Sequence, residues 1–333
     1  MKRQAPKRVV CIGGGTGTFV ALRGLKQYPV NLSAIVTMSD SGGSNRRIRD
    51  EFGLLPTSDI RQCLVALSDE NGGIGLLRKL FMYRFEKGKG IAGMTFGNLF
   101  MAALTDIVGT QEEAIRQTGK VLRIKGAVIP VTLTETNLHA TYEDGTTVSE
   151  EHLIDEPLHD GRLRIVKAYL TPKATPNPEA VAAIRGADMI VLGPGDLYTS
   201  LLPNVLVEGV ADALHGTKAD IVYVLNLMTK FGQTYNFTAT DHLSVLEGII
   251  GKSVDHVLVN TKPIPAKALS IYAKYHEMPV VDDLPRNSYF QVVTGNLISS
   301  ALYQKSSADA LVRSLIRHSS DRLAAALAAI INI

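Results

Sequence analysis

The amino-acid sequence predicts an α/β protein with a doubly wound, mainly parallel sheet, helices on both faces and a small β insertion. Short apolar runs rich in β-branched residues recur along the chain, and segments with helical periodicity separate most of them. Helix start signals stand between several of these runs, as expected when strands and helices alternate. Such alternation is typical of a parallel sheet whose crossover helices cover both faces.

Six runs have the length and composition of strands in the parallel sheet. They cover residues 8–12, 33–38, 127–133, 189–192, 220–225 and 256–259. Residues 138–142 and 146–148 flank the turn-forming tripeptide Glu143-Asp144-Gly145, which predicts a hairpin outside the parallel pattern. We therefore expect residues 1–333 to form a single domain that carries a β insertion at about 134–170.

Two helix starts can be located from short motifs. Thr110-x-x-Glu113 has the pattern of a capping box, in which both side chains accept hydrogen bonds from backbone amides at the helix start. In Asn177-Pro178, an N-capping residue precedes a proline that is suited to the first helical position. The motifs predict helices that begin just after Thr110 and Asn177.

The composition favours a globular protein with a sizeable core, because 45% of the residues are hydrophobic. A net charge of +3 is small for this length, so we expect no nucleic-acid partner. Cys11 and Cys63 lie far apart in sequence and lack metal-ligand spacing, which indicates reduced thiols. No apolar stretch reaches the roughly 20 residues of a membrane span, and residues 9–12 are too short for a signal-peptide core. We expect a cytoplasmic protein.

A glycine-rich loop follows the first predicted strand and leads into an apolar helix. Glycines let a backbone approach an anion closely, and the amides of a helix start provide hydrogen-bond donors and a positive dipole end. The loop has Thr18 where the dinucleotide fingerprint has glycine, and it lacks the lysine of the nucleoside-triphosphate loop. A tight turn without a ligand is the alternative. The phosphate-binding candidates are Gly13, Gly14, Gly15, Thr16, Gly17 and Thr18.

The second predicted strand ends in a polar sequence at the same carboxyl edge, where ligands of doubly wound sheets bind. Asp40 is a candidate for a ribose hydroxyl or for a magnesium ion shared with phosphates, and Ser44 is a further candidate ligand. A turn-forming aspartate before glycines is the alternative for Asp40. The arginines that follow are either phosphate ligands or a solvated face; they are Arg46, Arg47 and Arg49.

A second loop, after the predicted strand 189–192, again combines glycines, hydroxyl side chains and a following helix. Two such loops predict a cleft with two ends that bind anions. Other polar residues follow strand ends, and Asn98 either approaches a ligand or caps its helix. The candidates in this group are Gly193, Gly195, Tyr198, Thr199, Ser200, Asn98, Asn226, Thr229, Asn260 and Lys262.

The eight histidines show no metal-ligand spacing, and no serine–histidine–aspartate arrangement can be recognised. His242 and His318 each follow a charged residue, and we interpret both as helix-surface residues rather than catalytic groups. The sequence thus indicates phosphate binding without an evident general base. That pattern fits a binding protein, and it also fits phosphoryl transfer, in which positioning and charge dominate catalysis.

These motifs, in their order and spacing, resemble the YvcK/CofD family over nearly the whole chain. The resemblance rests on the loop Gly13–Thr18, the loop Gly193–Ser200 and a set of shorter motifs. The shorter motifs are Asp40–Ser44, Asp59-Ile60-Arg61, Gly97-Asn98, Asn226-x-Met228-Thr229, Thr240-Asp241-His242 and Arg317-His318. The length and the late motifs are similar to the YvcK branch, the gluconeogenesis factors. The CofD branch is the 2-phospho-L-lactate transferase of deazaflavin coenzyme synthesis.

The resemblance implies a Rossmann-like core and a nucleotide-sugar ligand such as UDP-N-acetylglucosamine or UDP-glucose. It also implies a role in cell shape and in growth on gluconeogenic carbon sources, linked to the cell-wall synthesis machinery, and we expect a homodimer. The protein would then be a regulatory sensor without turnover. The alternative is a transferase similar to CofD, with a nucleotide-diphospho donor and magnesium at Asp40.

Two late residues match the YvcK branch, and we expect them to hold the sugar end of the ligand, because the first loop accommodates only phosphates. They are Tyr272, which could stack on a ring, and Arg317, which could bind a phosphate or a pair of hydroxyls. The alternative for Arg317 is a surface ion pair with Asp321, four residues further along a helical face.

Overall fold

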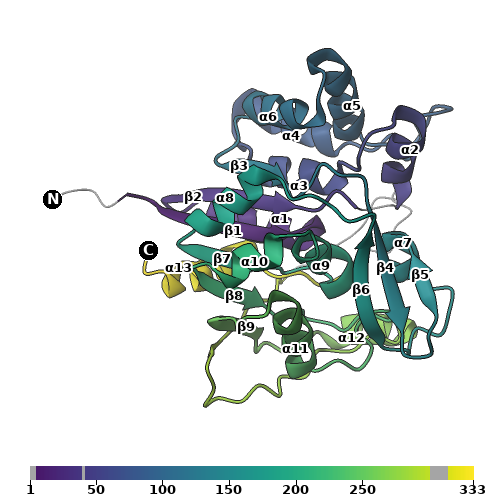
Figure 1. Cartoon of the computed structure of the whole chain (residues 1–333). Coiled ribbons are helices and arrows are strands. Elements are labelled where there is room, and N and C mark those ends of the chain that lie inside the picture. The colour runs from purple at the N-terminus through teal and green to yellow at the C-terminus, as the bar shows by residue number, and fades with distance from the viewer. Residues whose placement is uncertain (1–4, 40–41, 301–313) are drawn as a thin grey trace.

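The computed structural model describes residues 5–39, 42–300 and 314–333, and a seven-stranded sheet forms its centre (Figure 1). All neighbouring strands in this sheet are parallel. In spatial order the strands are β10 (Gln291–Gly295), β9 (His256–Asn260), β8 (Asp220–Val224), β7 (Met189–Leu192), β1 (Lys7–Gly13), β2 (Val30–Val36) and β3 (Ala127–Pro130). The order runs outward from β1 in both directions, so the sheet is doubly wound. The predicted α/β class is confirmed.

Helices connect the strands and cover both faces of the sheet. The longer ones are α1 (Gly15–Leu25), α2 (Gly43–Phe52), α3 (Ser58–Leu67), α4 (Gly72–Met82), α5 (Phe96–Val108), α6 (Gln111–Val121), α8 (Pro178–Gly186), α11 (Ala239–Ile250) and α13 (Ser320–Ile330). The shorter ones are α7 (Glu151–Asp155), α9 (Leu202–Val205), α10 (Val210–His215), α12 (Ala266–Tyr272), the π-helical turn η1 (Leu197–Leu201) and the 3₁₀ turn η2 (Ala273–Tyr275).

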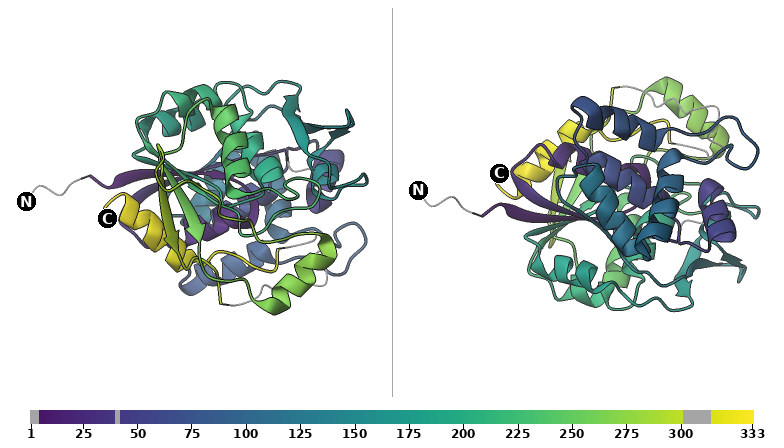
Figure 2. Two further views of the ribbon diagram at one scale, coloured as in Figure 1. Left: turned by 90° about the horizontal axis from the view of Figure 1, so that it is seen from below. Right: turned by 90° about the horizontal axis from the view of Figure 1, so that it is seen from above.

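Alternate residues of β1 belong to two separate cores, one on each face of the sheet. Val9 and Cys11 pack with residues of α1, α3 and α13, whereas Val10 and Ile12 pack with residues of α8, α10 and α11. Both sets are almost fully buried. Figure 2 shows the resulting three layers, with the teal and dark-green helices α8, α10 and α11 on one side of the sheet and purple, blue and yellow helices, among them α1, α3 and α13, on the other. Because both faces of the sheet are buried, its strands appear in the sequence as continuous apolar runs rather than as alternating apolar and polar residues.

The predicted β insertion is present as a three-stranded antiparallel sheet beyond the carboxyl ends of the parallel strands (Figure 1). Its strands, in the order β5-β4-β6, are β5 (Thr147–Ser149), β4 (Asn137–Tyr142) and β6 (Ile165–Thr171). The fully buried Tyr142 donates a hydrogen bond from its hydroxyl to the carbonyl of Gly232, 3.1 Å away. The insertion is thereby tied to the loop that follows β8.

Several element boundaries differ from the prediction. The strand expected at 33–38 begins three residues earlier, the one expected at 127–133 ends at Pro130, and β10 was not predicted. Thr110 and Asn177 are N-caps, as predicted. The side chain of Glu113, however, contacts Arg116 and Gln117, and the complete capping box lies at Thr238 and Asp241.

Candidate functional site

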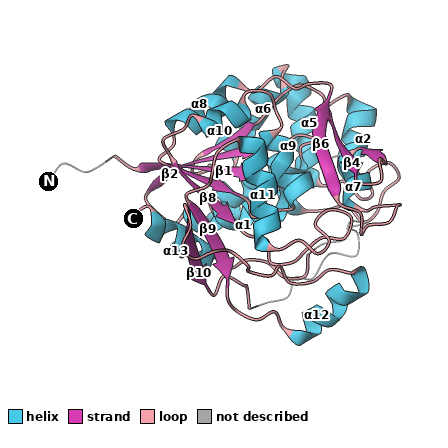
Figure 3. Cartoon of the chain, turned by 60° about the horizontal axis from the view of Figure 1, so that its bottom comes forward, coloured by secondary structure: helices cyan, strands magenta, loops and turns pink. Residues whose placement is uncertain are grey.

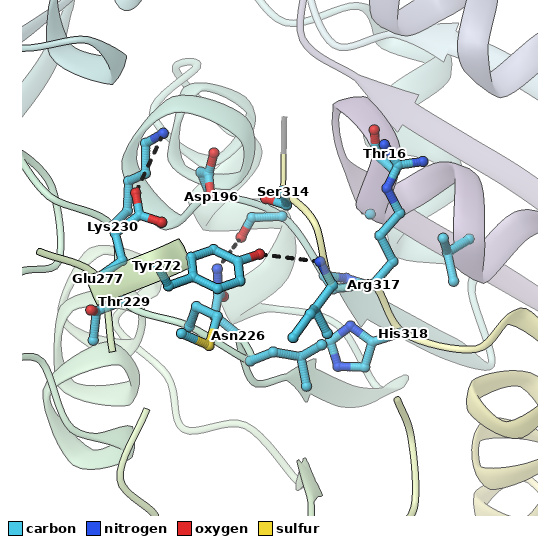
Figure 4. A pocket seen from close by; sticks show the side chains of 17 residues that line it. Thr16, Asp196, Asn226, Thr229, Lys230, Tyr272, Glu277, Ser314, Arg317 and His318 are labelled. Atoms are coloured by element: carbon cyan, nitrogen blue, oxygen red, sulfur yellow. Dashed lines mark hydrogen bonds and ion pairs between the residues drawn. The ribbon is translucent and has the colours of Figure 1, made fainter. Parts of the chain in front are cut away.

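The site lies where the strand order reverses, between β1 and its neighbour β7. Chains leaving these two strands turn to opposite faces of the sheet, which leaves a crevice at the carboxyl edge. A pocket occupies this position (Figure 4). Seven of the residues proposed from the sequence line it together: Thr16, Gly17, Gly195, Asn226, Thr229, Tyr272 and Arg317.

The first loop brings the start of α1 to the pocket. Its cap position is occupied by Gly14, so the cap residue has no side chain that could accept a hydrogen bond from the amides of the first turn. Gly15 has φ +60°, a left-handed conformation that favours glycine. A Cβ on Gly14 would meet the carboxylate of Asp59, which therefore lies directly against the loop. Unsatisfied amides at a helix start are the donors that phosphates accept from.

The second loop packs against the first one, backbone to backbone. A Cβ on Gly17 would meet the carbonyl of Pro194 and would lie 2.9 Å from the amide nitrogen of Gly195. The amide of Gly193 donates to the carbonyl of Ile12, at 3.0 Å. On the other side, the amide group of Asn226 donates to the carbonyl of Gly195 at 2.9 Å. The two glycine loops and the end of β8 therefore form one continuous floor.

Arg317 reaches the pocket from an extended segment ahead of α13, and Figure 4 shows its side chain directed toward Thr16. The segment is held by antiparallel contacts: the amide of Ser299 donates to the carbonyl of Arg317 at 2.8 Å, and that of Ser319 to Leu297 at 2.7 Å. The alternative of a helical pair between Arg317 and Asp321 is wrong, because only Asp321 lies in a helix.

Tyr272 is the last residue of α12 (Figure 3), and its side chain points toward this segment (Figure 4). Its hydroxyl accepts hydrogen bonds from the amides of Leu315 and Ile316, at 3.0 and 3.2 Å. The ring belongs to a small core with Ala268, Ile298 and Ile316, and burial raises the pKa of the hydroxyl above its usual value. Tyr272 lines the pocket, but its hydroxyl is already used to position the residues before Arg317.

Three charged residues at the pocket were not proposed as site residues from the sequence: Asp196, Lys230 and Glu277. Burial raises the pKa of Asp196, and the negative charge of Asp155 raises it further. Burial raises the pKa of Glu277 to about 7, and the opposing effect of the Lys230 charge is smaller. For Lys230, burial lowers the pKa, but the surrounding carboxylates outweigh it and keep the ammonium charged. Of these three residues, only Asp196 lies in a motif recognised in the sequence, the second glycine loop, and this position was the one signal that could have identified a site residue.

The interpretation of His242 and His318 as surface residues is wrong. His242 is fully buried in α11, where its Nδ1 lies 2.8 Å from the carbonyl of Thr238. His318 lines the pocket in the segment ahead of α13, and burial lowers its pKa to about 4. Within the part of the chain that the structure describes, Nε2 of each ring is buried without a hydrogen-bond partner. Both side chains are buried, although each residue follows a charged one in the sequence.

The remaining proposed residues of the first loop and of η1 are not among the residues that line the pocket. Thr18 is fully buried, with its hydroxyl facing Gly13. In η1, the hydroxyl of Tyr198 donates to Ile165 and that of Thr199 to Gln233, both at 3.4 Å. Gly193 and Ser200 shape the turn, since the amide of Ser200 donates to the carbonyl of Asp196 at 2.9 Å.

Asn98, Asn260 and Lys262 lie outside the pocket lining. Asn98 is fully buried, accepts from Nε of Arg61 at 2.9 Å and donates to the hydroxyl of Ser58 at 3.1 Å. The helix start beside it is capped by Thr95. Asn260 bonds to the backbone of Lys262 and of Leu297, which fixes a turn. Lys262 is exposed.

Asp40, the proposed magnesium ligand, lies outside the described residues, as does the side chain of Ser44. Among the residues that are described, no three His, Cys, Asp or Glu side chains are grouped so that they could hold a metal ion. The arginines that follow Asp40 pair along α2, with Arg46 bonded to Asp50 at 3.5 Å and Arg47 to Glu51 at 3.2 Å. Exposed pairs of this kind are typical of a solvated face.

The fold and the pocket define the class: a doubly wound α/β protein whose ligand pocket lies at the switch point of the sheet, next to a glycine-rich helix start. The family model described as "2-phospho-L-lactate transferase CofD" matches residues 9–298, and the chain belongs to this family. The resemblance noted in the sequence is thereby confirmed.

Individual relatives and a solved structure show which proteins the chain is similar to. It is 42% identical to a gluconeogenesis factor of Bacillus subtilis over 283 residues, which cover 84% of this chain and 87% of the relative. It is also 42% identical to a putative gluconeogenesis factor of a Nostoc species over 323 residues, 96% of this chain and 68% of the relative. A crystal structure of a Bacillus halodurans protein is similar with a TM-score of 0.87 at 38% identity, covering 97% and 99% of the two chains. None of the described helices is long and apolar enough to cross a membrane.

Proposed function

We propose that this protein is a nucleotide-sugar-binding regulatory protein whose pocket at the β1–β7 switch point holds a UDP sugar. The phosphates would accept hydrogen bonds from the first-turn amides of α1 and from Arg317. One observation carries the proposal: the amide end of α1 and Arg317 converge on the pocket from opposite ends of the chain. A helix start and a guanidinium together provide both the dipole and the forked donors that a diphosphate accepts.

The names of the relatives support a regulatory role, since several of them are called gluconeogenesis factors. We infer that the protein acts in the cytoplasm, as a homodimer, in growth on gluconeogenic carbon sources. Through the cell-wall synthesis machinery it would also influence cell shape. In this role the bound UDP-N-acetylglucosamine or UDP-glucose would report the supply of wall precursors. Purified protein should melt at a higher temperature with UDP sugars than with guanine nucleotides or deazaflavin.

Arg317→Ala tests the phosphate end directly. Loss of a forked donor pair to a phosphate should weaken UDP-sugar binding at least tenfold, about 1.4 kcal/mol, in titration calorimetry. The exposed Arg185→Ala is the matched control and should bind like the wild type. Equal affinity of Arg317→Ala and wild type, together with a lowered melting temperature, would show a purely structural arginine and would contradict the proposal.

A transferase similar to CofD is the second candidate, and the family model favours it. The carboxylate of Asp59 against Gly14 is a specific observation in its support, since phosphoryl-transfer sites use carboxylates beside a phosphate loop to hold magnesium. Phosphorus NMR of the protein with magnesium, a nucleotide-diphospho-lactate donor and a deazaflavin acceptor tests this candidate, because transfer of the phospholactyl group to the acceptor releases the nucleoside monophosphate. Turnover that Asp40→Asn and Asp59→Asn each abolish would support it, and unchanged spectra would remove it.

A further inference from the structure

The pocket has two chemically different ends. At one end lie Thr16 and Gly17 of α1, together with Arg317, and all three features favour an anion. At the other end lie Asp196, Lys230 and Glu277, and Figure 4 shows Asp196 and the Lys230–Glu277 pair on the side of the pocket away from Thr16. Carboxylates repel phosphate, so this second end must face a different part of any ligand bound to the first.

Lys230 is the centre of the second end. Its ammonium lies 3.6 Å from a carboxylate oxygen of Asp155 and 3.8 Å from one of Glu277, and its side chain is only 19% exposed. Asp155 is itself held by the amide group of Gln233, at 2.9 Å. Glu277 follows α12, and its own amide donates to the carbonyl of Tyr272 at 3.1 Å. The group is therefore fixed from α7, from the loop after β8 and from the segment after α12.

The chemistry of this group excludes a simple cation site. The ammonium of Lys230 already occupies the space between two carboxylates, where a bound cation would otherwise lie. What the pocket wall offers instead is a mixture of hydrogen-bond acceptors and donors in partly buried surroundings. Carboxyl groups whose pKa is raised, as for Asp196 and Glu277, exist in both the accepting and the donating form near neutral pH.

We propose that Asp196 and Glu277, positioned by Lys230, form a subsite that hydrogen-bonds the hydroxyl groups of the sugar carried by the nucleotide. Neighbouring hydroxyls of a sugar both donate and accept, which a mixed carboxylate and ammonium wall satisfies. The hydroxyl of Tyr272 already accepts hydrogen bonds from the amides of residues 315 and 316, so we assign the sugar to the carboxyl groups rather than to this hydroxyl. This assignment rests on the proposed function and adds to it the residues that select the sugar.

The test compares UDP with UDP-glucose by titration calorimetry, because both probes contain uridine diphosphate and only the second carries a sugar. Wild-type protein should bind UDP-glucose at least tenfold more tightly than UDP. The isosteric variants Asp196→Asn and Glu277→Gln should each reduce this preference to about threefold or less, since the amide replaces a charged acceptor by a neutral one and charge-assisted hydrogen bonds are stronger. Neither variant should bind UDP more than about twofold more weakly than the wild type, a result that general destabilisation of the pocket would not give.

Glu208→Gln is the matched control, since its carboxylate is exposed and pairs only loosely with Lys173 at 3.8 Å. It should retain the wild-type preference. If both pocket variants keep the tenfold preference while UDP still binds, the subsite assignment is overturned and the proposed function stands. If wild-type protein binds neither UDP nor UDP-glucose, the proposed function itself fails. Thermal melts identify a variant that does not fold. If one of the two pocket variants fails to fold, the sugar preference of the other variant tests the assignment.

Discussion

At Gly17, the backbone of α1 touches the backbone of the turn after β7, with no space for even one side-chain carbon. The sequence suggested a different reason for this glycine, the close approach of a phosphate. The structure gives two nearby glycines different reasons: Gly15 has the left-handed conformation that favours glycine, while Gly17 provides the contact between the two loops. The sequence motif around Gly17 could not reveal this contact, because the partner, Pro194, lies far away in the sequence.

Gly17→Ala should destabilise the protein by about 1–3 kcal/mol, because its new methyl group must displace the Pro194 carbonyl. Gly248→Ala in α11 is the control, since a Cβ there meets nothing within 4 Å. That control should stabilise the protein by about 0.5–1 kcal/mol through the better helix propensity of alanine. Urea unfolding of both variants measures the difference. An unaltered stability of Gly17→Ala would mean that the two loops separate freely.

His318 should make the protein less stable as the pH falls. Burial lowers its pKa from 6.5 to about 4. Between these two pH values the imidazole is therefore protonated in the unfolded chain and neutral in the folded protein. Its contribution is therefore present above pH 6.5 and declines toward pH 4. Relative to His318→Gln, the wild type should lose about 2 kcal/mol of unfolding free energy between pH 7 and pH 5.

Urea unfolding at the two pH values measures this loss. Glu277 has a raised pKa and works in the opposite direction, but it is present in both proteins and cancels in the comparison. A stability difference that does not change with pH would show that His318 is accessible to water in the folded protein.

Among the elements, α13 illustrates how a helix can be fixed by one close approach. A Cβ on Gly24 of α1 would meet the carbonyl of Ser320 and would lie 2.7 Å from Cβ of Ala324. The sequence contains an apolar stretch at residues 323–333. It could not show that the partner is α1 of the first βα unit, because helix pairing depends on small residues at one crossing point rather than on periodicity.

Two of the threonine N-caps, Thr110 and Thr238, offer a test of capping at the level of the element. Thr238 forms a reciprocal capping box with Asp241, whereas Thr110 only accepts from the amide of Glu113. Thr238→Ala should therefore lower the unfolding free energy by about 1–2 kcal/mol, and Thr110→Ala by about 0.5–1 kcal/mol. Thermal melts of both variants give the order. A larger effect at Thr110 would contradict the importance of the reciprocal bond.

At the scale of the whole molecule, the parallel sheet and the insertion could be predicted, because buried strands such as β7 and hairpin turns such as Glu143–Gly145 leave local signals. The edge strand β10 could not, since Gln291–Gly295 is short and largely not buried, with little apolar signal. Polar residues after strand ends were brought together at the pocket as expected for Asn226 and Thr229. The group around Lys230 depends on three segments meeting in space, which no local pattern encodes.

The position of β1 in the middle of the sheet has a consequence for biosynthesis. Its neighbour β2 follows within 17 residues, but β7, which covers the other edge, begins only at Met189. At about 5–20 residues per second, the apolar strand Val9–Ile12 has no partner on that edge for roughly 10–35 s while the ribosome continues. An uncovered, apolar strand edge recruits other chains. Nascent copies of this protein on one polysome are therefore most prone to join each other during that interval, before the second half of the sheet emerges.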